Sequence, residues 1–192
     1  MSPEIMRVFC CFLLACITFC SCIPQKKWEK ATITYNDDSQ KEAYIYASPF
    51  SYYNFIRAKS QLDDYRTIYP PDSIRSAVSA TAGYYSLFFD EERFGMESYG
   101  FVKRLAGEDL FLGVAKFKMK TCACKTSGGY FKGYFLVHGD KFIKLSLNLK
   151  GEILNKNEIN QFIEAEGYDY EIPAQITKVP ELLEAFEKIM VE

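Results

Sequence analysis

The chain has 192 residues, of which 48% are hydrophobic and 25% are charged, and this balance excludes a disordered chain. Its length allows one domain with a sizeable core. A net charge of -2 without a basic run excludes the electrostatic footprint of a nucleic-acid-binding protein.

The first 22 residues have the order of a secretory signal. Arg7 is followed by an uncharged apolar run, Val8 to Phe19, which is too short for a transmembrane helix because a span needs about 20 residues. Five of the seven cysteines lie in this segment among apolar neighbours, which does not fit a disulfide framework. We therefore expect residues 1–22 to direct export.

The end of this signal resembles a bacterial lipobox, in which a cysteine thiol becomes a thioether to a diacylglycerol and forms the new N-terminus. Cys22 is the favoured attachment site, because it keeps the whole apolar run before it and releases a polar start, IPQKKWEK. Cys16 is the alternative, since the residues before it match the four-residue motif better. A third possibility is a cleaved signal without a lipid. Residues 23–27 would form a short tether, and the protein would be anchored in the bacterial cell envelope, in the periplasm or at the outer membrane.

Residues 28–192 read as one β-rich domain. Aromatic residues make up 16% of the chain and favour strands, since they fit a pleated, half-buried surface. Apolar alternation between turn residues predicts about nine short strands, at 28–35, 42–47, 52–58, 65–69, 73–81, 84–89, 99–106, 110–120 and 130–147. The last range holds both arms of a hairpin. The expected fold is an antiparallel curved sheet, barrel or sandwich.

The hairpin at 130–147 is expected at the centre of this sheet. On its second arm Ile143, Leu145 and Leu147 alternate with polar positions, as in a strand with one buried face. Between the arms His138-Gly139-Asp140 supplies a turn, because glycine accepts the positive φ of a tight hairpin.

The last third of the chain changes to a helical period. The first predicted helix covers 155–166, where Asn155 and Glu158 have the spacing of a capping box. The second covers 180–191 and begins at Pro180, whose missing N–H costs nothing there. Both helices are expected to pack on the sheet.

In this order of features, the chain resembles uncharacterised secreted proteins and lipoproteins of Gram-negative bacteria. The matching pieces are the early strand pair at 31–47, the segment 68–74 (IYPPDSI), the segment 101–105 with the Gly107 turn, the Tyr134-Phe135 strand and the two C-terminal helices. The resemblance concerns a fold pattern, and it implies no activity.

Few residues could carry chemistry. His138 is the only histidine of the chain, which leaves little for a catalytic triad or a histidine-rich metal site. Cys122 and Cys124 are two residues apart, so both thiols would share a face of an extended segment, and His138 could join them as a third soft ligand. The simpler interpretation is two small residues at the end of a strand. The acidic pairs of the chain lie in predicted turns, where solvation explains them.

These observations predict a non-enzymatic, lipid-anchored envelope protein that binds a protein, glycan or lipid partner and needs no cofactor. The alternative is a periplasmic thiol-redox or metal-binding protein that uses Cys122 and Cys124. A hydrolase ranks third because the chain has a single histidine.

Overall fold

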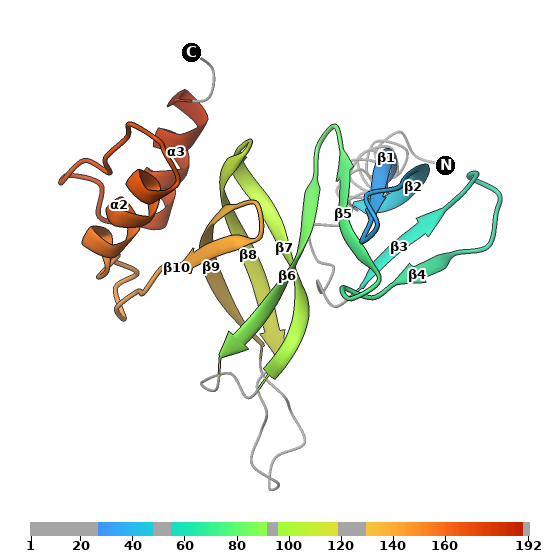
Figure 1. Cartoon of the computed structure of the whole chain (residues 1–192), viewed down its shortest axis with the longest axis horizontal. Helices are drawn as coiled ribbons and strands as arrows, with labels where there is room; N and C mark the ends of the chain where they lie inside the picture. The colour runs from blue at the N-terminus through green and yellow to red at the C-terminus, as the bar shows by residue number, and fades with distance from the viewer. Residues whose placement is uncertain (1–26, 48–54, 92–95, 119–129, 190–192) are drawn as a thin grey trace, which may run out of the picture.

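One antiparallel sheet dominates the computed structural model, which describes residues 27–47, 55–91, 96–118 and 130–189 (Figure 1). Its ten strands are β1 (Lys27–Tyr35), β2 (Gln40–Ala47), β3 (Ile56–Lys59), β4 (Thr67–Tyr69), β5 (Ile74–Ser79), β6 (Gly83–Glu91), β7 (Met96–Gly107), β8 (Leu110–Lys118), β9 (Tyr130–His138) and β10 (Lys141–Lys144). The predicted mainly β fold is confirmed. The sheet is open, so the barrel and sandwich versions of that prediction are not adopted.

The strand order is β10-β9-β8-β7-β6-β5-β1-β2-β3-β4. From β5 onward each strand pairs with the next in the chain, as the turn spacing predicts. The exception is β1, which pairs with β2 on one side and with β5 on the other. The meander from β1 to β4 therefore forms one end of the sheet. After β4 the chain places β5 beside β1, and the remaining strands follow from β5.

The β6–β10 part of the sheet curls on itself. Phe89 of β6 and Phe142 of β10 have ring centroids 5.1 Å apart, although β7, β8 and β9 lie between these strands in the sheet. Phe135 of β9 packs against both rings. The curl therefore encloses an aromatic cluster on the inner face, and the opposite face of the same strands needs a separate cover.

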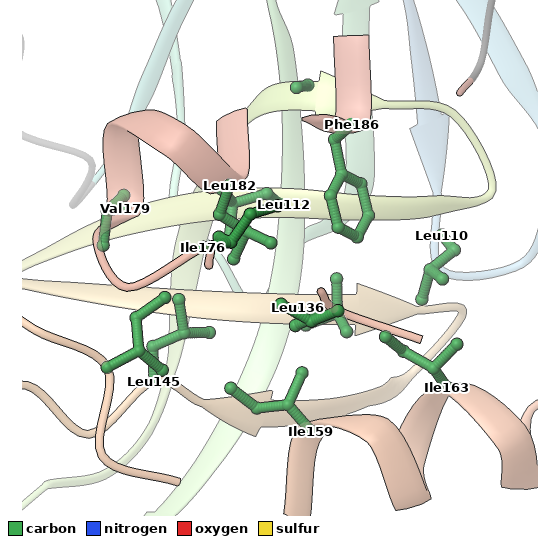
Figure 2. Close-up of a cluster of buried hydrophobic side chains, with 13 residues drawn as sticks. Leu110, Leu112, Leu136, Leu145, Ile159, Ile163, Ile176, Val179, Leu182 and Phe186 are labelled. Atoms are coloured by element: carbon green, nitrogen blue, oxygen red, sulfur yellow. The ribbon is translucent and has the colours of Figure 1, made fainter. Parts of the chain in front are cut away.

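Two helices supply that cover. They are α2 (Lys156–Ala165) and α3 (Val179–Ile189), whose apolar sides meet β8 and β9 in the cluster of Figure 2. Ile159 and Ile163 of α2 and Leu182 of α3 are fully buried there. The predicted helices are confirmed with slightly different bounds. No helix in the described ranges is long and apolar enough to cross a bilayer.

The placement of the 130–147 hairpin at the centre of the sheet was wrong. Its second arm, β10, is an edge strand of four residues, after which the chain leaves to build α2. The expected single buried face also fails, because Phe142 packs into the inner aromatic cluster while Leu145 lies in the helix-covered cluster. Alternation finds a strand but does not reveal what covers each of its faces.

The capping-box prediction at Asn155 was wrong as well. The side chain of Asn155 makes no capping bond to α2. Its Oδ1 accepts from the Ser146 N–H at 2.9 Å, and its Nδ2 donates to the Lys144 carbonyl at 2.9 Å. Asn155 thus ties α2 to the chain leaving β10. A carboxylate cap occurs instead on α3, where Glu181 accepts from the Thr177 and Lys178 N–H groups.

The burial of Leu145 in the helix-covered cluster predicts how much stability a cavity at this position would cost. Leu145 is 3% exposed, so Leu145→Ala should lower the free energy of unfolding by about 2–5 kcal/mol, because the cavity adds to the lost transfer energy. Leu149→Ala is the matched control, since Leu149 is fully exposed in the next turn, and it should cost under about 0.5 kcal/mol. Urea unfolding measures both, and equal costs would contradict the assigned packing.

Candidate functional site

Two turns and the end of α2 meet at one end of the curled β6–β10 part. The β7–β8 turn contains Glu108 and Asp109, and the β9–β10 turn contains Gly139. Gly107 opens the first turn at φ +89°, where a Cβ would lie 2.3 Å from the Leu110 carbonyl oxygen, so this turn requires glycine. Burial, with the nearby Asp109 carboxylate, raises the pKa of Tyr168, just beyond α2. Glu108, Asp109 and Gly139 line one cavity, and Glu166 at the end of α2 bonds to His138 and Lys141 on either side of the β9–β10 turn, so the three segments form one polar rim.

A cavity of about 400 Å³ opens at this rim. It is lined by Tyr85, Arg104, Glu108, Asp109, Phe111 and Gly139. The Tyr85 and Phe111 rings are tilted against each other with centroids 4.6 Å apart, and they form an aromatic wall. The volume lies within the usual range of ligand pockets, and the lining combines apolar rings with a few charged groups. We call this cavity the rim pocket.

Among the described residues, Arg104 is the only cation that lines the rim pocket. Its guanidinium lies over the Tyr85 ring, 5.9 Å from the centroid. Among the described residues no carboxylate comes within the 4.0 Å of an ion pair with it. Gly83 leaves the space for this pair, since a Cβ there would lie 3.1 Å from the Tyr85 ring and 3.2 Å from Arg104 Nε. An arginine without an ion-pair partner in a pocket can bind an anionic group.

Asp140 of the β9–β10 turn belongs to a chain of charged pairs that reaches across the sheet. Asp140 lies 3.6 Å from Arg75 of β5, which also pairs with Asp38 of the β1–β2 turn at 2.6 Å. These exposed pairs are individually weak. They nevertheless join the turn that carries Gly139 to the other half of the sheet.

His138 forms a cluster with Glu166 and Lys141 beside the rim pocket. The Glu166 carboxylate lies 2.7 Å from His138 Nδ1 and accepts from Lys141 Nζ at 2.8 Å. The hydrogen bonds from Lys141 and from His138 hold the pKa of the Glu166 carboxyl below its usual value. Because an ionised carboxylate can only accept, the Nδ1 atom carries a proton, and in the neutral ring Nε2 keeps a lone pair. The Tyr168 ring packs edge-on against the His138 ring, with the two centroids 5.4 Å apart.

A histidine oriented by a carboxylate has two well-known uses, as a general base and as a metal ligand. For the first use, no hydroxyl or thiol within the described ranges hydrogen-bonds the His138 ring. For the second, the described part of the chain contains no group of three or more histidine, cysteine, aspartate or glutamate side chains that could hold a metal. Cys122 and Cys124, the other predicted ligands, lie outside the described residues, as do Cys16 and Cys22.

The sequence pattern did not predict the rim pocket. Only a charged pair inside an apolar strand, Lys103-Arg104, could have drawn attention to it. The face on which Arg104 lies depends on its strand partners and on the register shift between Arg104 and Ala106 in the β7–β8 pairing. In the sequence, Tyr85 and Phe111 are indistinguishable from other aromatic residues of strands. Only the curl of the sheet brings β6 and β8 together at the rim.

Comparisons with protein-family models, with curated proteins and with solved structures found no match to this chain. The resemblance to secreted proteins and lipoproteins of Gram-negative bacteria therefore stays a prediction.

The Glu166 cluster predicts a pH dependence of stability. Because the folded-state pKa of Glu166 is lowered, its contribution is present above the usual glutamate pKa and is lost as the pH falls through the folded value. Glu166→Gln should therefore reduce the loss of stability on acidification, as measured by urea unfolding at a series of pH values below neutrality. Glu164→Gln, at an exposed site on the same helix, is the control and should keep the wild-type acid profile. An unchanged profile in Glu166→Gln would contradict the assignment.

Proposed function

We propose that this protein is a non-enzymatic, lipid-anchored binding protein of the cell envelope. The anchor is the lipid on Cys22, supported by the short apolar run and the lipobox-like end of the signal. The binding part is the β domain with its rim pocket. The observation that carries the binding role is Arg104, a pocket guanidinium that lies over the Tyr85 ring and has no ion-pair partner among the described residues.

The lining of the rim pocket favours a small acidic sugar as the ligand. Arg104 would bind the carboxylate of the sugar through a two-pronged hydrogen bond. Glu108 and Asp109 would accept hydrogen bonds from sugar hydroxyls. A simple anion fits less well, because the two carboxylates would repel it without gaining a hydrogen bond.

A binding role also explains His138 without a reaction. The ring uses Nδ1 to join β9 to Glu166, and Lys141 of β10 binds the second oxygen of the same carboxylate. The cluster thereby fixes the β9–β10 turn, whose Gly139 lines the rim pocket. Its role is to position the wall of the pocket.

Arg104 is the test of this pocket. In ligand-observed NMR, D-glucuronate should bind the wild-type protein more tightly than D-glucose, because only glucuronate has a carboxylate for Arg104. Arg104→Ala should weaken glucuronate binding by about tenfold or more, from the loss of a charged hydrogen-bond pair of about 1.5–3 kcal/mol. Arg104→Lys should retain part of the affinity, since lysine keeps the charge without the planar fork.

Arg66→Ala is the matched control, because Arg66 is exposed in the β3–β4 loop and away from the pocket lining. It should bind glucuronate like the wild type. Equal binding of glucuronate and glucose, or unchanged glucuronate binding in a folded Arg104→Ala protein, would contradict the proposal.

A second candidate function is a thiol or metal site formed by Cys122, Cys124 and His138. Its support is the Glu166–His138 hydrogen bond, which presents the Nε2 lone pair as carboxylates do behind metal-bound histidines. If this function holds, the purified protein should bind zinc in stoichiometric amount, and His138→Ala should weaken zinc binding by about 10–100-fold or more. Zinc binding that survives Cys122→Ser with Cys124→Ser would contradict it.

A further inference from the structure

The outer face of β1, β2 and β3 combines aromatic rings with cations. Trp28 and Lys30 alternate on β1 with the buried Ala31 and Ile33, so they point to the opposite side of the sheet from the core. Their cross-strand partners on β2 are Tyr46 and Tyr44, and Tyr44 in turn pairs with Lys59 of β3. The six residues of this surface, which we call the Trp28 face, are Trp28, Lys30, Tyr44, Tyr46, Arg57 and Lys59.

The side chains of the Trp28 face contact each other. The rings of Trp28 and Tyr46 meet edge to face at 5.4 Å, and Lys59 Nζ lies over the Trp28 ring, 5.1 Å from its centroid. Arg57 lies over Phe55, which is partly exposed just before β3. Ile68 of the edge strand β4, opposite Arg57, is 58% exposed. Apolar rings and an isoleucine thus continue to the edge of the sheet, interleaved with basic groups.

The charge of this face is positive. Lys30 is paired with Glu42 at 2.8 Å, whereas no carboxylate within the described ranges forms an ion pair with Arg57 or Lys59. Asp63 and Asp64 lie beyond the face, in the loop between β3 and β4, where Asp64 accepts from the Gln61 N–H. Tyrosine and tryptophan with lysine and arginine is the composition that suits the boundary between lipid headgroups and acyl chains. Lys59 Nζ donates to the Leu62 carbonyl at 2.6 Å, so it keeps its charge without a carboxylate partner. Anionic headgroups would complement the charges of Arg57 and Lys59.

The position of the face along the chain agrees with a membrane. β1 begins at Lys27, five residues after Cys22. A fully extended segment of this length spans at most about 18 Å. A lipid on Cys22 would therefore hold the Trp28 end of β1, and Tyr46 beside it, close to the bilayer surface. In Figure 1, β1 and β2 lie at the end of the molecule away from α2 and α3, so this contact would leave the helices facing outward.

We infer that the Trp28 face docks on an anionic lipid bilayer and sets the orientation of the domain on its anchor. The aromatic rings would lie at the headgroup boundary, and Arg57 and Lys59 would bind lipid phosphates. The inference relies on the proposed lipid anchor and is independent of the ligand of the rim pocket.

The single tryptophan makes the inference directly measurable, since Trp28 is the only Trp of the chain. The full-length lipidated protein is placed in vesicles whose lipids are brominated near the top of the acyl chains, and its emission is compared with that in vesicles without bromine. We expect Trp28 quenching to be about twofold or more stronger in vesicles of equal phosphatidylcholine and phosphatidylglycerol than in phosphatidylcholine alone, and to fall at high salt.

The variant Arg57→Glu with Lys59→Glu should lose this preference for anionic vesicles. The matched control is Lys150→Glu with Lys188→Glu, which makes the same change in net charge at exposed sites near the helices and should behave like the wild type. Because Lys59 touches the Trp28 ring, each variant is referred to its own emission in bromine-free vesicles.

Intact mass, measured first, separates the two proposals. A diacylglycerol adduct on Cys22 with no quenching, or with equal quenching in neutral and anionic vesicles, overturns the docking inference and leaves the anchor in place. If the Trp28 emission changes with the protein concentration and does not change with the lipid, the docking inference is overturned, and the face is instead a contact between two copies of the chain. A mature protein without the adduct overturns the anchor proposal and the docking inference together.

Discussion

The contact between Phe89 and Phe142 is the constraint on which the rest of this structure depends. It joins β6 to β10 across three intervening strands, so the sheet must curl between them. Phe135 completes the cluster, and each aromatic pair adds about 0.5–1.5 kcal/mol beyond the area that it buries. With the inner face of β6–β10 filled by this cluster, the outer apolar face has to be buried by other elements. The packing of the two helices on this outer face is the consequence of the curl.

The curl also creates the candidate site. In a flat sheet the β7–β8 turn and the β9–β10 turn would lie beside each other without enclosing space. Here they converge over Tyr85 and Phe111, and the result is a pocket that Arg104 lines as the one cation from the described part of the chain. The helices contribute indirectly, because Glu166 directly follows α2 as its C-cap residue and so brings a carboxylate to His138 and Lys141. The same packing that buries Ile159 and Ile163 therefore positions the turn of the pocket.

The two halves of the sheet serve different ends of the proposed function. The β6–β10 half, with its helices, carries the rim pocket. The β1–β4 half carries the Trp28 face and lies directly after the proposed tether. Arg75 of β5 links them, since it pairs with Asp38 on one side and with Asp140 of the β9–β10 turn on the other. Docking of one half would thus determine where the other half presents its pocket.

The sequence by itself determined the features that depend on near neighbours. Alternation placed most strands within a few residues, as at Trp28 to Tyr35, and a helical stripe placed α2 and α3, because side-chain period follows from local backbone geometry. Gly139 marked a turn because of its backbone freedom, which φ +57° in the structure uses. Only the tertiary structure decided the rest: the edge position of β10, the pairing of β1 with β5, the partners of Asn155 and the pocket around Arg104. Each of these depends on contacts between residues far apart in the chain, and the period of a segment carries no information about which distant segment will cover it.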